Sequence, residues 1–98
     1  MAMALKDREP TIRALRQMAL RGDSIQAMLN FVLDSHGLNG ITAVACFKVA
    51  FDSRINHVKP VGDWVGFCGP MTDSEVEEHL SPVIETWRKR IEGDEKRA

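Results

Sequence analysis

The side chains that could bind a metal ion or a cofactor are few in this chain, and they are scattered. Its three histidines and two cysteines are His36, Cys46, His57, Cys68 and His79. No pair of them has the i, i+3 or C-x-x-C spacing that holds metal ligands together on one element. We therefore predict no metal site and no cofactor.

The candidates for nucleophilic or acid–base catalysis lie between residues 57 and 68. Cys68 follows Phe67 in a glycine-rich stretch, His57 precedes it by eleven positions, and Asp63 stands beside Trp64. A catalytic thiol needs a lowered pKa and a base within hydrogen-bond reach, and the sequence indicates neither. We predict no catalytic residue, and we keep an enzyme or ligand binder that uses Asp63, Cys68 or His57 as a third hypothesis.

Arginines and acids are segregated along the chain. Residues 10–22 contain three bases and no acid: Arg13, Arg16 and Arg21. Residues 72–87 contain five acids and no base: Asp73, Glu75, Glu77, Glu78 and Glu85. These segments could pair within one molecule, pair between copies, or attract a partner of opposite charge. An acidic helix suits the inhibition of a basic target, whereas the arginines could contact nucleic-acid phosphates.

The segment from Val58 to Met71 is a second candidate binding feature. It places Trp64 and Phe67 among glycines, and aromatic side chains on loops dominate many binding surfaces. In a small domain, however, a large aromatic ring is needed to cover the core. Trp64 is therefore either an exposed contact or a core residue, and the small size of the domain favours the core.

Glycines and capping residues divide the chain into helices. We predict helices over residues 10–22, 24–36 and 72–93, which end at Gly22, Gly37 and Gly93. The last helix starts with a Thr72–Glu75 capping box, and Pro82 should kink or break it.

Residues 41–51 are ambiguous, because their apolar side chains fit both a helix and an alternating strand. Three alanines and the length of the segment favour a helix, and burial on two sides would explain its apolar content. Residues 52–70 contain repeated glycines and prolines, which predicts an irregular loop with a short 3₁₀ turn or a β-bridge.

These elements predict an all-α fold: a small bundle of about four helices with a long irregular Gly/Pro-rich loop before the last one. The 98 residues form a single small helical domain, with residues 1–9 and 94–98 frayed. No apolar stretch is long enough to span a bilayer, and the N-terminus lacks a signal-peptide pattern. We expect a cytosolic protein with free thiols at Cys46 and Cys68.

A non-enzymatic protein-binding module is the function that these observations favour. Its most concrete form is a small cytosolic inhibitor of immunity or antitoxin type, whose partner would be a basic protein. The partner-binding residues would be Asp63, Trp64, Phe67, Glu75 and Glu78. The alternative is a regulator that contacts nucleic acid through Arg13, Arg16 and Arg21, although the net charge of −1 argues against it. A homodimer fits either function, because so short a chain could leave the apolar segment 41–51 partly uncovered.

Overall fold

A computed structural model describes residues 8–97, with the side chains of residues 8–93, and this part of the chain is mostly helical. It contains five α-helices and one 3₁₀ helix: α2 Arg8–Arg21, α3 Ile25–His36, α4 Gly40–Ala50, α5 Ile55–Gly62, η1 Val65–Phe67 and α6 Asp73–Arg97. Between residues 8 and 97 the only β pairing is an isolated bridge that joins Trp64 to Met71. The all-α prediction is confirmed.

Capping residues mark the ends of α3 and the start of α4. The side chain of Ser24 accepts a hydrogen bond from the backbone N–H of Ala27 at the start of α3. Gly37 ends α3 with a φ of 70°, a left-handed value that favours glycine, and its N–H donates to the carbonyl of Leu33. Asn39 then caps α4, so the helical interpretation of residues 41–51 is confirmed.

The chain ends that the sequence predicted to be frayed belong to helices where the structure describes them. Arg8 and Glu9 already belong to α2, whereas residues 1–7 lie outside the described residues. At the other end, α6 continues past Gly93 to Arg97, because a single glycine costs a helix only about 1 kcal/mol. Pro82 lies inside α6 without breaking it into two helices. Pro82 is on the exposed side, where water can satisfy the carbonyl that a proline leaves unbonded.

The segment 52–70 is not an irregular loop, because α5 forms a fifth helix within it. The two valines Val58 and Val61 are buried at i, i+3 spacing and hold α5 to the core. Pro60 lies inside this helix. Because proline usually breaks helices, the sequence pattern predicted a loop here. The shorter features predicted for the segment are present, since η1 and the Trp64–Met71 bridge follow α5.

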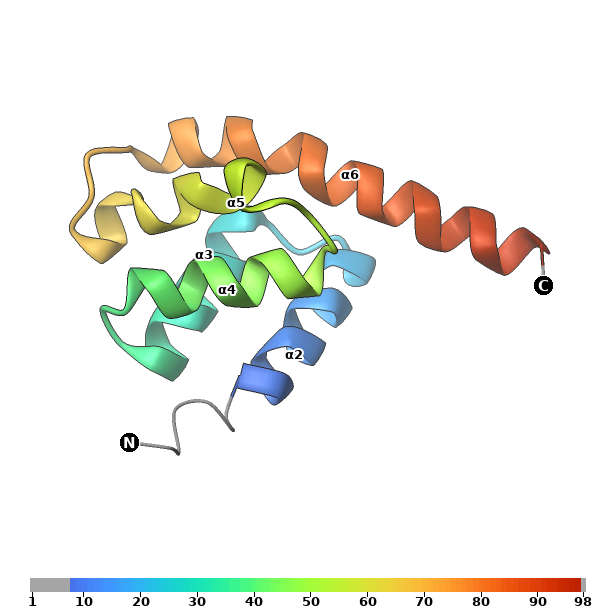
Figure 1. Ribbon diagram of the computed structural model, residues 1–98, viewed down its shortest axis with the longest axis horizontal. Helices are drawn as coiled ribbons and strands as arrows, with labels where there is room; N and C mark the ends of the chain where they lie inside the picture. Colours follow the sequence, from blue (N-terminus) through green and yellow to red (C-terminus); the bar gives the residue numbers. More distant parts are fainter. Residues whose placement is uncertain (1–7, 98) are drawn as a thin grey trace.

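The helices pack around one core, with α5 between α4 and α6, α3 behind α4, and the C-terminal part of α6 reaching beyond the others (Figure 1). Gly40 and Gly62 let α4 and α5 approach closely, since a Cβ on Gly62 would lie 3.0 Å from Val44 Cγ2. In the centre, the rings of Phe47, Phe51 and Trp87 form a chain, with centroids 5.9 and 5.2 Å apart.

Two arginines hold helix ends together across the bundle. Arg16 of α2 donates from Nε to the carbonyl of Ala50 (2.8 Å) and from Nη2 to that of Val49 (3.0 Å) at the end of α4. Arg88 of α6 donates to the carbonyl of Ala19 near the end of α2 (2.8 Å). Guanidinium groups at helix C-termini satisfy free carbonyls and oppose the negative end of the helix dipole.

Candidate functional site

The aromatic residues after α5 belong to the core. Trp64 is only 4% exposed, and its ring packs edge-on against Phe67 with centroids 5.3 Å apart. The indole N–H donates to the carboxylate of Asp73 at the start of α6. Gly66 makes room for the ring, because a Cβ there would lie 2.3 Å from Trp64 Cζ3. Trp64 therefore folds back over the core, and Phe67 is buried with it.

Backbone hydrogen bonds close the same segment, Asp63–Met71, which we call the Trp64 loop. Met71 N–H donates to the carbonyl of Asp63 (2.8 Å), and Val65 N–H donates to that of Met71 (2.7 Å). Asp63 is half-buried and ends α5, while Val65 is the large apolar side chain that the loop leaves exposed. The loop thus contributes less exposed apolar surface than its sequence suggests.

The acids at the start of α6 serve the helix itself. The carboxylate of Glu75 accepts hydrogen bonds from Thr72 N–H (3.0 Å) and Oγ1 (3.1 Å), which completes the predicted capping box. These bonds lower the pKa of Glu75. Glu75 and Glu78 are both exposed, whereas Trp64 and Phe67 are buried. Their role in binding a basic partner stays a prediction.

The arginines of α2 are engaged within the molecule to different degrees. Arg16 caps α4, as described above, and Arg21 forms an ion pair with Asp23 that raises the pKa of Arg21. Arg13 lies 4.0 Å from Glu9, with both side chains largely exposed. Two of the three predicted phosphate contacts thus have acceptors within the chain, and the nucleic-acid role stays a prediction.

The other candidate groups are dispersed by the fold. Cys46 is buried, which raises the pKa of its thiol, whereas Cys68 is exposed, and neither forms a disulfide. His36 Nε2 lies 2.8 Å from Thr11 Oγ1 and joins α3 to α2. Among the side chains of residues 8–93, three or more histidine, cysteine, aspartate or glutamate groups nowhere gather closely enough to hold a metal ion. Over residues 8–97, no helix is both long and apolar enough to cross a membrane.

Among the large apolar side chains that the structure describes, the one with the highest exposed fraction lies on α4. Ile41 is 85% exposed, Val49 is 50% exposed, and Leu38 just before the helix is 68% exposed. Ile41, Ala45, Lys48 and Val49 share one side of α4 by their i, i+4, i+7, i+8 spacing. We call these four residues and Leu38 the α4 face. In the view of Figure 1, no helix lies in front of α4.

Burial of α4 on two sides, which the sequence predicted, is therefore wrong. The opposite side is fully buried through four residues: Ala43, Cys46, Phe47 and Ala50. A helix that is apolar all round needs neighbours all round. Here α2, α3 and α5 pack against α4, and the α4 face is left to solvent. Residues 41–51 are apolar on all sides of the helix, and so short a chain has few other helices to cover them. This was the feature of the sequence that could have indicated an exposed apolar surface.

A hollow of about 530 Å³ continues the α4 face at its C-terminal end. Val49, Trp87 and Ile91 give it apolar walls, Arg16 and Lys48 border it with positive charge, and Asp52 is the one acid in its lining. Neither α4 nor α5 contains an acid, and each carries one lysine, Lys48 and Lys59. The exposed surface of these two helices is therefore apolar and basic.

Comparison of the chain with protein-family models, with curated proteins and with solved structures finds no match.

Proposed function

We propose that this domain is a non-enzymatic protein-binding module and that the α4 face is its docking surface. The single observation that carries this proposal is the exposure of Ile41, at 85%, on a helix whose opposite side is the centre of the core. Holding apolar side chains in water is unfavourable by about 25 cal/mol per Å², and a partner that covers them recovers this free energy. The rigid helix behind the face fixes their positions before binding, which lowers the entropic cost.

The partner segment that fits this surface is an acidic amphipathic helix of another protein. Its apolar side would lie along Ile41 and Val49 and reach the hollow beside Trp87, as helices occupy apolar grooves elsewhere. Its acidic side chains would meet the exposed lysines Lys48 and Lys59. This charge assignment differs from the basic partner expected from the sequence, since the acids Asp73 and Glu75 bond within the chain.

The concrete form of the proposal is a small inhibitor of immunity or antitoxin type that acts in the cytosol. Such a protein needs no chemistry of its own, because occupying an essential surface of its target is enough. The α4 face suits this role if the target's acidic helix lies at or beside that target's active surface. Addition of the purified domain should then abolish the target's activity at one-to-one stoichiometry.

Photo-crosslinking in the cells that produce the protein tests the docking surface. A photoreactive amino acid replaces Ile41 in one variant and Glu78 in a matched control variant, since both positions are exposed. We expect crosslinks at position 41 to one segment that carries both apolar and acidic residues. A synthetic peptide of that segment should bind the wild-type chain about tenfold more tightly than the Ile41→Asp variant.

Three outcomes would overturn the proposal. Crosslinks at position 78 alone would show that the partner binds at the acids of α6 and not at the α4 face. Crosslinks from position 41 to a second copy of the chain would make the α4 face a self-association surface. Crosslinks from position 41 to nucleic acid would favour the arginine-based alternative.

A further inference from the structure

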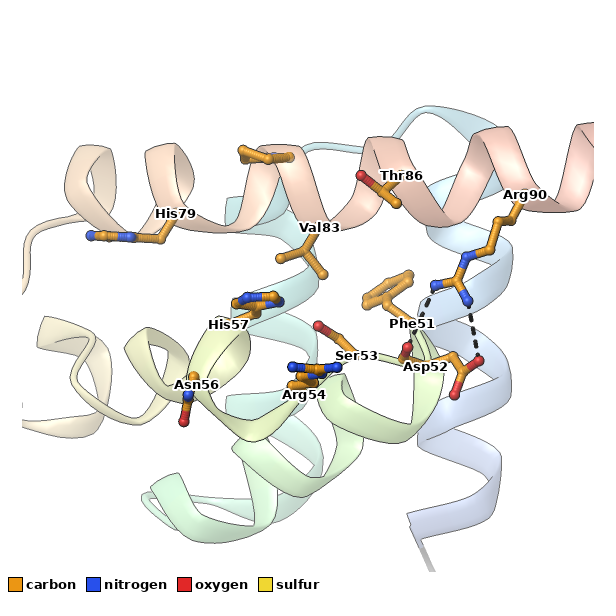
Figure 2. A pocket seen from close by; sticks show the side chains of 11 residues that line it. Phe51, Asp52, Ser53, Arg54, Asn56, His57, His79, Val83, Thr86 and Arg90 are labelled. Carbon is orange, nitrogen blue, oxygen red and sulfur yellow. Dashed lines mark hydrogen bonds and ion pairs between the residues drawn. The ribbon is translucent and has the colours of Figure 1, made fainter.

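A cleft of about 460 Å³ lies between α6 and the turn that joins α4 to α5. His79, Val83, Thr86 and Arg90 form one wall, and their i, i+4, i+7, i+11 spacing places them on one side of α6. Figure 2 shows Val83 and Arg90 pointing from α6 toward the α4–α5 turn and the first turn of α5. Phe51 belongs to the buried core and forms part of the lining. No residue of the α4 face lines this cleft.

Basic side chains outnumber acids in the lining. Two arginines and two histidines contribute to it, Arg54, His57, His79 and Arg90, against a single acid, Asp52. Arg90 Nη1 already lies 3.3 Å from Asp52 Oδ2, so this pair is balanced within the cleft. Arg54 and the two imidazoles remain to meet an anion, and of these His79 already acts on one acid, because its charge adds to the Thr72 hydrogen bonds in lowering the pKa of Glu75. The nearest further acid on the same side of α6 is Glu75, whose carboxylate accepts the two hydrogen bonds from Thr72.

The backbone contributes in the same direction. Arg54 is the N-cap of α5 and makes no side-chain capping bond there. The N–H of His57 donates to the Arg54 carbonyl (3.0 Å), and the first N–H groups of α5 have no side-chain acceptor at the N-cap. Donors of this kind support an anion that the side chains already attract.

The cleft is larger than an inorganic anion and partly apolar. A volume of about 460 Å³ falls in the range of sites for small organic ligands. Pro82 and Val83 offer apolar contacts next to the imidazole of His79. We propose that this cleft binds a small organic phosphate monoester, with its phosphate held by Arg54, His57 and His79 and its organic group against Pro82 and Val83. Arginine suits this role because its planar fork donates two parallel hydrogen bonds to phosphate oxygens.

Nuclear magnetic resonance titration of the full chain tests this site independently of the proposed docking function. The probes are phenyl phosphate, inorganic phosphate and phenol. We expect saturable shifts of the Arg54, His57 and His79 signals with phenyl phosphate. Its affinity should exceed that of inorganic phosphate about tenfold, because the ring adds apolar contact.

Variants of exposed residues locate the binding without disturbing the core. Arg54→Ala and His79→Asn should each weaken phenyl phosphate binding about tenfold. Lys89→Ala is the matched control, since it removes an exposed base of α6 outside the cleft and should leave binding unchanged. Unchanged amide spectra of the free variants would verify that they fold.

Four results would overturn the proposal. No saturable shift in the millimolar range would exclude the site. Equal affinities for inorganic phosphate and phenyl phosphate would indicate an adventitious ion only. Binding of phenol as tight as phenyl phosphate would remove the role of the cations. If Lys89→Ala and Arg54→Ala weakened phenyl phosphate binding equally, the binding would come from general electrostatic attraction and not from this cleft.

Discussion

The Trp64 loop and α4 are both rich in apolar residues, yet the fold treats them in opposite ways. The loop buries Trp64 and Phe67, whereas α4 leaves Ile41 and Val49 in solvent. The loop can do so because Gly66 lets the indole ring lie over the backbone. A helix fixes successive side chains about 100° apart, so a helix that is apolar all round cannot turn every side chain toward one core. Apolar residues on a rigid helix therefore indicate a docking surface better than aromatic residues on a glycine-rich loop.

Truncation of one apolar side chain in the Trp64 loop and of one on α4 should give the largest difference in unfolding free energy. We expect Trp64→Ala to lower the free energy of unfolding by about 3–5 kcal/mol, because it empties a buried site and removes the indole bond to Asp73. Ile41→Ala should change it by less than about 0.5 kcal/mol. Urea unfolding followed by circular dichroism measures both. Equal losses in the two variants would break the comparison.

A methyl group at Gly66 tests how the loop buries its ring. The new Cβ of Gly66→Ala would overlap the Trp64 ring, so we expect a loss of about 1–3 kcal/mol in unfolding free energy. Gly93→Ala is the matched control, because no heavy atom lies within 4 Å of a Cβ at that helical position. It should stabilise the chain by about 0.5–1 kcal/mol. A Gly66→Ala variant as stable as the wild type would show that the ring can lie elsewhere.

Replacement of Arg16, at the edge of the α4 face, tests whether its charge stabilises the end of α4. Arg16→Met removes the guanidinium bonds to the carbonyls of Val49 and Ala50, and we expect a loss of about 1 kcal/mol. Arg13→Met removes an exposed charge near Glu9 and should cost less than about 0.5 kcal/mol. Thermal unfolding of the two variants measures the difference. If both behave alike, Arg16 does not stabilise the end of α4.

The smallest expected effect is a dependence of stability on pH through Glu75 at the start of α6. Hydrogen bonds from Thr72 lower the pKa of Glu75 below its ordinary value of 4.5 in the folded chain. The contribution of this group to stability is therefore complete above that value and is lost as the pH falls through the folded pKa. Between about pH 7 and about pH 3, the urea midpoint should fall more for the wild type than for Glu75→Gln. Identical pH dependence would mean that the capping box does not persist in solution.

The local parts of the fold were predictable, because they depend on residues close in sequence. Ser24, Gly37 and the Thr72–Glu75 pair each mark a helix end through contacts within a few positions. The helix α5 was missed, since Pro60 resembles a breaker and only the tertiary contacts of Val58 and Val61 stabilise the segment.

The candidate site was harder to predict, because exposure depends on which neighbours cover each side of a helix. The apolar character of residues 41–51 indicated that part of this segment could stay uncovered, but not that α2, α3 and α5 would leave Ile41 in particular exposed. The sequence likewise gives no sign that Asp73 accepts the indole hydrogen bond of Trp64 and so holds the ring inside. The segregation of arginines and acids was visible, but the use of Arg16 and Arg88 as helix caps requires the three-dimensional arrangement.

Isothermal titration with the peptide that crosslinks at position 41 tests the central claim most directly. The titration compares wild-type protein with Ile41→Asp and with Glu78→Lys, a charge change on α6 away from the α4 face. The α4 docking surface predicts about tenfold weaker binding for Ile41→Asp and unchanged binding for Glu78→Lys. Unchanged affinity for Ile41→Asp together with a loss for Glu78→Lys would contradict it.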